Sequence, residues 1–183
     1  MKKLIIFFTI LTAISCSKTT GEEVQTITIK DKYSLTIPKF LKESFMLNQD
    51  ASLSYENQFK ELYVIVLDED KQELKDLLEQ NNALELYPED LEAYHELCSV
   101  TFKDALAEYK EIAISTTEVN NLPAIIQSFS ATEEGNEIYY YLGTYESKNT
   151  YYQVLTWTLL SSKEKHKAQM EAMLMSLKDL QKI

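Results

Sequence analysis

The sequence predicts an α+β fold: a mainly antiparallel sheet with helices on both faces. Three observations support this. Alternating apolar and polar stretches separated by turn sequences occupy both halves of the chain, which is typical of antiparallel strands. Residues 62–67 are apolar without alternation, so this strand needs a covering layer on each side. Apolar stripes at helical spacing, at residues 91–109 and 170–180, provide those layers.

The first predicted element is a hairpin. Val24–Ile29 and Tyr33–Ile37 alternate around a turn at residues 30–32, and Pro38 ends the second strand. The elements expected next are a short helical or irregular piece at Phe40–Phe45 and two strands at Ala51–Glu56 and Leu62–Asp68.

Two helices are predicted in the middle of the chain. Asp70 and Glu73 have the spacing of a capping box with Asp70 as the N-cap, and three leucines follow at helical spacing. The second helix is expected to begin after Tyr87, with Pro88 in its first turn. Its apolar stripe continues over about six turns and comprises Leu91, Tyr94, Cys98, Phe102, Ala105 and Tyr109.

The C-terminal part is predicted to be a strand meander followed by a closing helix. Turn sequences at Glu134–Asn136 and Ser147–Asn149 connect the strands, and Ser161 and Glu164 form a second capping box that opens the helix. The strands are expected at Ile112–Val119, Pro123–Thr132, Asn136–Tyr145 and Tyr151–Leu160. The helix stripe is Met170, Met173, Leu174, Leu177 and Leu180.

The order of these elements resembles the Mog1/PsbP-like α/β/α sandwich over residues 24–180. The segments that carry the resemblance are Tyr33–Pro38, Asp50–Leu53, Glu61–Val66 before a helix, and the strand and helix from Tyr151 to Leu180. The resemblance implies a small non-enzymatic module, because members of this family bind a GTPase or attach to a photosynthetic complex. No functional motif of the family matches, so no binding residue is carried over.

Residues 1–15 are predicted to be an export signal. Lys2 and Lys3 precede an apolar run that is too short to span a bilayer, and small residues follow it. Ala13-Ile14-Ser15-Cys16 resembles the lipobox of bacterial lipoproteins, although the first lipobox position is most often Leu. The resemblance implies lipidation of Cys16. The alternative is secretory cleavage after Ser15, which leaves Cys16 as a free thiol.

Residues 16–23 are predicted to be the lipidated cysteine and a flexible tether, and residues 24–183 a single α+β domain. The tether is short and polar and contains Gly21. The lipid then holds the protein at a membrane of the bacterial cell envelope. Ser17 directly after Cys16 resembles the pattern that sorts lipoproteins of enteric bacteria to the outer membrane, where the domain faces the periplasm or the cell exterior.

The charge balance argues against a nucleic-acid partner. The chain has 18 basic and 29 acidic side chains, a formal net charge of −11, and no arginine. Binding to a phosphate backbone needs clustered Lys and Arg, which this chain lacks. Its three glycines provide no glycine-rich phosphate loop, and we expect no cofactor.

Candidate catalytic and metal-binding residues are isolated from one another. Glu92 and His95 have the spacing of a di-iron ligand pair, but His166 has no glutamate three residues before it. Cys98 is expected to be a buried small hydrophobe, and Asp68–Asp70 to start a helix instead of binding Ca²⁺. No nucleophile elbow is present. We therefore predict no catalytic and no metal site, although an unassigned pair of carboxylates stays open.

Tyrosines are concentrated in the C-terminal strands. Alternation sends Tyr139, Tyr141 and Tyr145 to one face of the sheet and Tyr140 to the other. We expect most of them to fill the layers between sheet and helices, with hydroxyls at the rims. The alternative is an aromatic platform for a sugar, a peptide or a partner protein, with Tyr145 and Tyr151 as candidate partner contacts. The full cluster is Tyr139, Tyr140, Tyr141, Tyr145, Tyr151, Tyr152 and Trp157.

The sequence therefore favours a lipid-anchored, non-catalytic binding or accessory module of the cell envelope, whose partner is a protein or another envelope component. The alternative is an envelope hydrolase with an unrecognised carboxylate or serine site. For the core, the sequence predicts that Trp157 and the strand at residues 62–67 are buried between helical layers.

Overall fold

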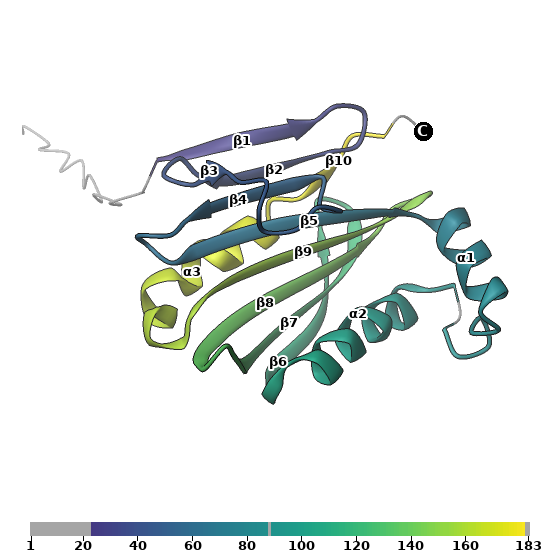
Figure 1. Ribbon diagram of the computed structural model, residues 1–183. Helices are drawn as coiled ribbons and strands as arrows, with labels where there is room; N and C mark the ends of the chain where they lie inside the picture. The colour runs from purple at the N-terminus through teal and green to yellow at the C-terminus, as the bar shows by residue number, and fades with distance from the viewer. Residues whose placement is uncertain (1–22, 88, 182–183) are drawn as a thin grey trace, which may run out of the picture.

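The computed structural model describes residues 23–87 and 89–181. The predicted export signal, Cys16 and Pro88 lie outside the described residues. Two antiparallel sheets are formed (Figure 1). The smaller sheet has the order β1 (Val24–Ile29), β2 (Tyr33–Pro38) and β10 (Lys178–Asp179). The larger has the order β3 (Lys42–Glu43), β4 (Leu53–Asn57), β5 (Leu62–Asp70), β9 (Thr150–Leu159), β8 (Asn136–Glu146), β7 (Leu122–Glu133) and β6 (Ala107–Val119).

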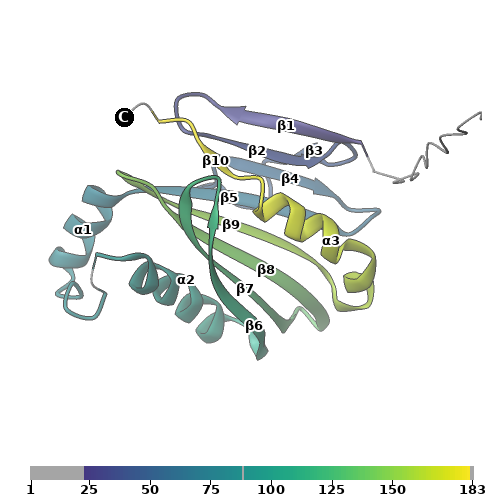
Figure 2. The same cartoon turned by 180° about the vertical axis from the view of Figure 1, so that it is seen from behind.

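Helices cover both faces of the larger sheet, as predicted. The described residues contain α1 (Lys71–Gln80), α2 (Leu91–Ala105), a short 3-10 turn η1 (Leu160–Ser162) and α3 (Lys163–Leu174). Figures 1 and 2 show α3 and the smaller sheet on one side of the larger sheet and α2 on the other. The chain therefore forms the expected α+β sandwich. The predicted hairpin is β1–β2, and the predicted C-terminal meander is β6 to β9.

Strand β5 lies between β4 and β9 and is buried on both faces, as predicted. Leu62, Val64 and Val66 face the core under α3 and the smaller sheet. Ile65 faces the opposite core, together with Tyr94 and other residues of α2. Burying these apolar side chains stabilises the fold, and it is possible only where a layer covers each face of the strand.

The prediction that Trp157 is buried in the core is wrong. The indole is only half-buried and stacks on Tyr63, with ring centroids 5.2 Å apart. Tyr63 and Trp157 are paired across β5 and β9, and Trp157 also packs against the core on the α2 side of the sheet. The cross-strand contact of the two rings covers part of the indole that the core leaves exposed.

Helix α2 begins with the side chain of Asp90 accepting a hydrogen bond from the backbone N–H of Ala93, at 2.8 Å. It ends at Ala105, so the prediction that Tyr109 continues its stripe is wrong. Tyr109 lies in β6, where its ring stacks on Phe129 at 4.9 Å. Pairing with β7 starts at Ala107, and this long-range pairing overrides the local helical periodicity.

Two expectations for the closing helix are corrected. The N-cap of α3 is Ser162 instead of the predicted Ser161, and the Ser162 side chain makes no capping bond but donates to Glu61 at 3.3 Å. The helix ends at Leu174, whereas the predicted stripe continued to Leu180. After the helix, the backbone N–H of Leu180 donates to the carbonyl of Lys32, which holds the C-terminal segment beside β2.

Tyr145 is the side chain that fixes β8 against α3. It is fully buried, and its hydroxyl donates to the carbonyl oxygen of Leu174 at 2.9 Å. The ring lies over Gly143, two residues earlier on the same face of the strand. A Cβ atom added to Gly143 would lie 2.8 Å from Cζ of Tyr145, so this position excludes a side chain.

We predict that Gly143→Ala destabilises the fold by about 1–3 kcal/mol, the usual cost of overpacking a close-packed core. The added methyl group collides with the buried Tyr145 ring, which has no free space to move into. Urea unfolding followed by circular dichroism measures the change. Tyr145→Phe, which removes one hydrogen bond, is expected to cost about 1 kcal/mol. An unchanged unfolding midpoint for Gly143→Ala would contradict the packing.

Candidate functional site

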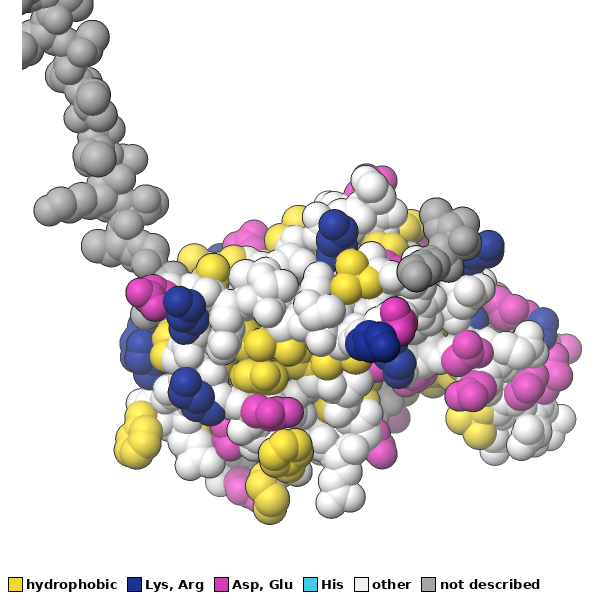
Figure 3. Space-filling view, turned by 90° about the horizontal axis from the view of Figure 1, so that it is seen from above, with side chains coloured by type: hydrophobic (Ala, Val, Ile, Leu, Met, Phe, Trp, Pro, Cys, Tyr) yellow, Lys and Arg dark blue, Asp and Glu magenta, His cyan; other side chains and the backbone are white. Residues whose placement is uncertain are grey.

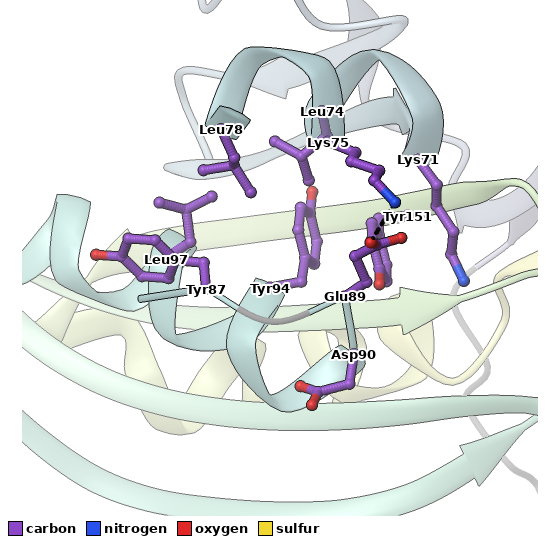
Figure 4. Close-up of a pocket in the computed structure, with 10 residues that line it drawn as sticks. All are labelled: Lys71, Leu74, Lys75, Leu78, Tyr87, Glu89, Asp90, Tyr94, Leu97 and Tyr151. Atoms are coloured by element: carbon purple, nitrogen blue, oxygen red, sulfur yellow. Dashed lines mark ion pairs between the residues drawn. The ribbon is translucent and has the colours of Figure 1, made fainter. Parts of the chain in front are cut away.

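The candidate site is a pocket at the end of the sheet where α1 projects, and we call it the α1–α2 pocket. Its volume is about 140 Å³. Helix α1 forms one wall, α2 and the segment before it form the opposite wall, and β9 contributes Tyr151 (Figure 4). The lining residues from α1 are Lys71, Leu74, Lys75 and Leu78, and the others are Tyr87, Glu89, Asp90, Tyr94, Leu97 and Tyr151.

The centre of the pocket is a stacked pair of tyrosines. The rings of Tyr94 and Tyr151 lie 4.4 Å apart at an angle of 9°, and each residue is only 3% exposed. Neither hydroxyl has a hydrogen-bond partner, although both are buried. Burial raises the pKa of Tyr94 well above its ordinary value and that of Tyr151 to about 12. Both side chains are therefore neutral hydrogen-bond donors at physiological pH.

The charged residues of the pocket are already paired. Lys71 donates to Glu146 at 2.5 Å, and its ammonium lies 4.5 Å from the centre of the Tyr151 ring. Lys75 pairs with Glu89 at 2.7 Å across the pocket, as the dashed line in Figure 4 shows. The remaining carboxylate, Asp90, accepts the capping bond of α2. No lysine of the pocket is left to neutralise an anionic ligand.

The end of the molecule that carries the pocket is strongly acidic. Residues 68–92 contain ten acidic side chains and two lysines, a formal charge of −8. Figure 3 shows Asp and Glu side chains gathered on the projecting end at the right of the view. The field of these carboxylates repels anions from the mouth of the pocket.

The two tyrosines predicted as partner contacts differ in their positions. Tyr145 was expected at the rim of the sheet, but it is 0% exposed and bonded to Leu174 inside the core. That prediction of its position is wrong, because alternation gives the face of a residue but not the depth of the layer above it. Tyr151 is also buried, but unlike Tyr145 it lines the α1–α2 pocket.

The aromatic cluster does not form one platform. Tyr139, Tyr141 and Tyr145 lie on the α3 side of the sheet and Tyr140 on the α2 side, as alternation predicted. Most of these rings are core residues with aromatic neighbours. Tyr140 stacks on Phe129, and Tyr152 meets Tyr33 edge to face.

The two histidines have structural hydrogen bonds. His166 is buried. Its Nε2 lies 2.9 Å from the carbonyl oxygen of Lys60, and its Nδ1 lies 2.7 Å from Oε1 of Gln169. His95 is also buried, at 4% exposure, and its Nδ1 lies 3.0 Å from the Thr144 hydroxyl. Its Nε2 has no partner. Glu92 lies near His95 at a shallow surface pocket, so the two do share one helical face.

Cys98 and the acidic run are placed largely as predicted. Cys98 is buried, and burial together with the Glu69 carboxylate raises the pKa of its thiol to about 12. Asp70 caps α1 by accepting from the N–H groups of Gln72 and Glu73. Asp68 belongs to β5 and pairs with Lys32 at 2.6 Å, so only the last residue of the run starts the helix.

Within residues 23–87 and 89–181, no three His, Cys, Asp or Glu side chains are grouped so that they could hold a metal ion. In the same part of the chain, no helix is both long and apolar enough to cross a membrane.

Sequence comparison finds no matching family model and no matching curated protein. The fold itself is PsbP-like. The solution structure of cyanobacterial PsbP (CyanoP) from Synechocystis sp. PCC 6803 matches with a TM-score of 0.59 and 10% identity, over 90% of this chain and 97% of that one. LpqN of Mycobacterium tuberculosis, described as involved in cell envelope biogenesis, matches with a TM-score of 0.54 and 8% identity, over 86% and 90%. At these identities the likeness establishes the fold alone.

Sequence reasoning missed most of the pocket. Tyr94 was assigned to the apolar stripe of α2, and nothing in the spacing shows that its hydroxyl is without a partner. Lys71 and Lys75 lie on one face of α1 with two leucines, an amphipathic pattern that also fits a helix packed on a core. The one sequence feature that could have indicated this site was the concentration of acidic residues around the Asp70 capping box.

We predict that His95 makes the fold less stable in acid. Burial lowers the pKa of His95 below the value of about 6.5 expected in the unfolded chain. The unfolded state then binds the proton more readily, so the free energy of unfolding falls as pH decreases through 6.5 towards the folded pKa. Urea unfolding at pH 7.5 and 5.5 measures this loss. His95→Gln should lose less stability over the same interval, and an equal loss in both proteins would contradict the prediction.

We also predict that the Cys98 thiol is unreactive in the folded protein. Because its pKa is about 12, little thiolate exists at pH 8. Alkylation by iodoacetamide, measured by mass spectrometry in a Cys16→Ser background, should be at least about a hundredfold slower than in urea. Equal rates in the folded and unfolded protein would show that Cys98 is accessible and ionised.

Proposed function

We propose that this protein is a lipid-anchored, non-catalytic binding module of the bacterial cell envelope. The observation that carries the binding role is the α1–α2 pocket, where the buried hydroxyls of Tyr94 and Tyr151 have no partner. A buried polar group without a partner costs about 1–3 kcal/mol. A bound ligand that supplies the missing hydrogen bonds recovers this cost.

The thiol, hydroxyl and imidazole groups of Cys98, Ser99 and His95 on α2 are held in unreactive forms, which supports a non-catalytic role. Burial keeps the Cys98 thiol protonated. Ser99 donates to Gln127 at 2.7 Å, while His95 pairs with Thr144, so neither group activates the other. No hydrogen bond joins a serine to a histidine in the described part of the chain. The alternative, an envelope hydrolase, has no observation of this kind in its favour.

The envelope location is supported by the sequence and by the fold. The leader and the Ala13–Cys16 motif predict export and lipidation. The fold is shared with LpqN, a protein described as involved in cell envelope biogenesis. In this proposal the lipid on Cys16 is the contact with the membrane, and the acidic domain binds a protein or another envelope component instead of the anionic lipid surface.

We predict that Cys16→Ser releases the protein from the membrane fraction or leaves it unprocessed. Without the thiol there is no acceptor for the lipid that holds the protein at the membrane in this proposal. Cell fractionation followed by immunoblotting measures the distribution. The matched control is Cys98→Ser, which removes the other cysteine and should leave the protein with the membrane.

Two results would overturn parts of the proposal separately. Mature protein whose Cys16 is unmodified by mass spectrometry would exclude lipid anchoring. Turnover of a defined substrate by the purified protein, abolished by His95→Ala while the fold persists, would exclude the non-catalytic role.

A further inference from the structure

The inner face of helix α1 lines the α1–α2 pocket and is only partly buried. None of its ten residues is buried. The only ones that are even half-buried are Lys71, Leu74, Lys75 and Leu78, and these four line the α1–α2 pocket. Leu74 packs against the core on the α2 side of the sheet, and the rest of the inner face of α1 is only partly covered by the protein. An occupant of this pocket would bury apolar surface of α1 that the free protein leaves partly exposed.

The pocket has an apolar side and a polar side. Figure 4 shows Leu78, Leu97 and Tyr87 on one side of Tyr94, and Lys71, Lys75 and Glu89 on the other. The volume of about 140 Å³ is close to that of an engineered apolar cavity of about 150 Å³ that binds benzene. The pocket thus fits one six-membered ring with a small polar substituent.

The polar substituent must exchange hydrogen bonds with the two buried hydroxyls. Tyr94 and Tyr151 are each 3% exposed, and the Tyr94 hydroxyl interacts with the Cys98 thiol, a weak hydrogen-bonding group, and with the Glu69 carboxylate. Both hydroxyl oxygens are covered in the free protein, so a ligand must displace a covering side chain before its hydroxyl or carbonyl oxygen can accept from either tyrosine. A ring without such an oxygen would bury the two hydroxyls without compensation.

The charges around the pocket exclude an anionic substituent. Lys71 and Lys75 are already paired with Glu146 and Glu89. The surrounding residues 68–92 carry a formal charge of −8. A carboxylate on the ligand would meet this field with no free cation to neutralise it.

We propose that the α1–α2 pocket binds a non-anionic, ring-sized group that carries a hydroxyl or carbonyl oxygen, for which phenol is the simplest form. This proposal rests on the binding role proposed above and assigns that role a ligand class. The phenol group has two sources, a free small molecule or the side chain of a tyrosine at the surface of a partner. The two sources share the same contacts with Tyr94 and Tyr151.

Ligand-detected NMR on the purified full-length chain tests the ligand class. The probes are 4-methylphenol, toluene, 4-hydroxyphenylacetate and N-acetyltyrosinamide. We expect 4-methylphenol to bind, toluene to bind about threefold to tenfold more weakly for each lost hydrogen bond, and 4-hydroxyphenylacetate not to bind. Binding of N-acetyltyrosinamide as tight as that of 4-methylphenol indicates a tyrosine on a partner, and its exclusion indicates a free small molecule.

Tyr94→Phe and Tyr151→Phe test the site, with Tyr55→Phe on β4 as the matched control outside the pocket. Each pocket variant should bind 4-methylphenol about threefold to tenfold more weakly and toluene unchanged. Each should also have an unchanged or higher unfolding midpoint, because it removes a buried hydroxyl that has no partner. Tyr55→Phe should leave the affinities for both probes unchanged.

The proposal is wrong if 4-methylphenol does not bind, if it binds no better than toluene, or if 4-hydroxyphenylacetate competes with it equally. It is also wrong if the pocket variants bind normally and unfold at lower urea, because the hydroxyls would then be structural. These outcomes are independent of the location of the protein in the cell. Failure here leaves the Cys16 fractionation result intact, and release of wild-type protein from the membrane leaves the binding result intact.

Discussion

The burial of β5 on both faces is the constraint on which the rest of the structure depends. A strand with Leu62, Val64 and Val66 on one side and Ile65 on the other is stable only between two apolar layers. The smaller sheet and α3 supply one layer, with Met170 fully buried, and α2 supplies the other, with Tyr94. Once α2 takes that face, α1 lies beyond the end of the layer, and the pocket forms between the two helices.

Local patterns predicted most of the fold because they report which face of an element is apolar. The alternation of Tyr33–Ile37, the two-sided strand at residues 62–67 and the Asp70 capping box all correspond to elements of the structure. Element ends were predicted less well. Tyr109 continues the helical spacing of α2, but the ladder between β6 and β7 begins before it, and no local signal encodes this long-range pairing.

Sequence patterns also failed to predict how deeply a residue is buried. Tyr145 and Tyr151 have similar sequence surroundings, yet the first is held over Gly143 beneath α3 and the second lies at the pocket. The pairing of Tyr94 with Tyr151 joins residues far apart in the chain, and it depends on the crossing of α2 over β9. The composition of residues 68–92 shows that this segment is acidic, but whether a buried hydroxyl has a partner depends on every neighbour that surrounds it.

The pocket is a place where local stability is not maximised. A fully packed fold would place the apolar side of α1 on the sheet, yet Leu74 and Leu78 are only half-buried and Leu77 is 56% exposed. Two buried tyrosine hydroxyls without partners add to this cost. Departures from local optimisation occur at functional sites more than elsewhere in a protein. The departures in α1, Tyr94 and Tyr151 meet at one pocket, and this coincidence is the reason why the proposed ligand is placed there.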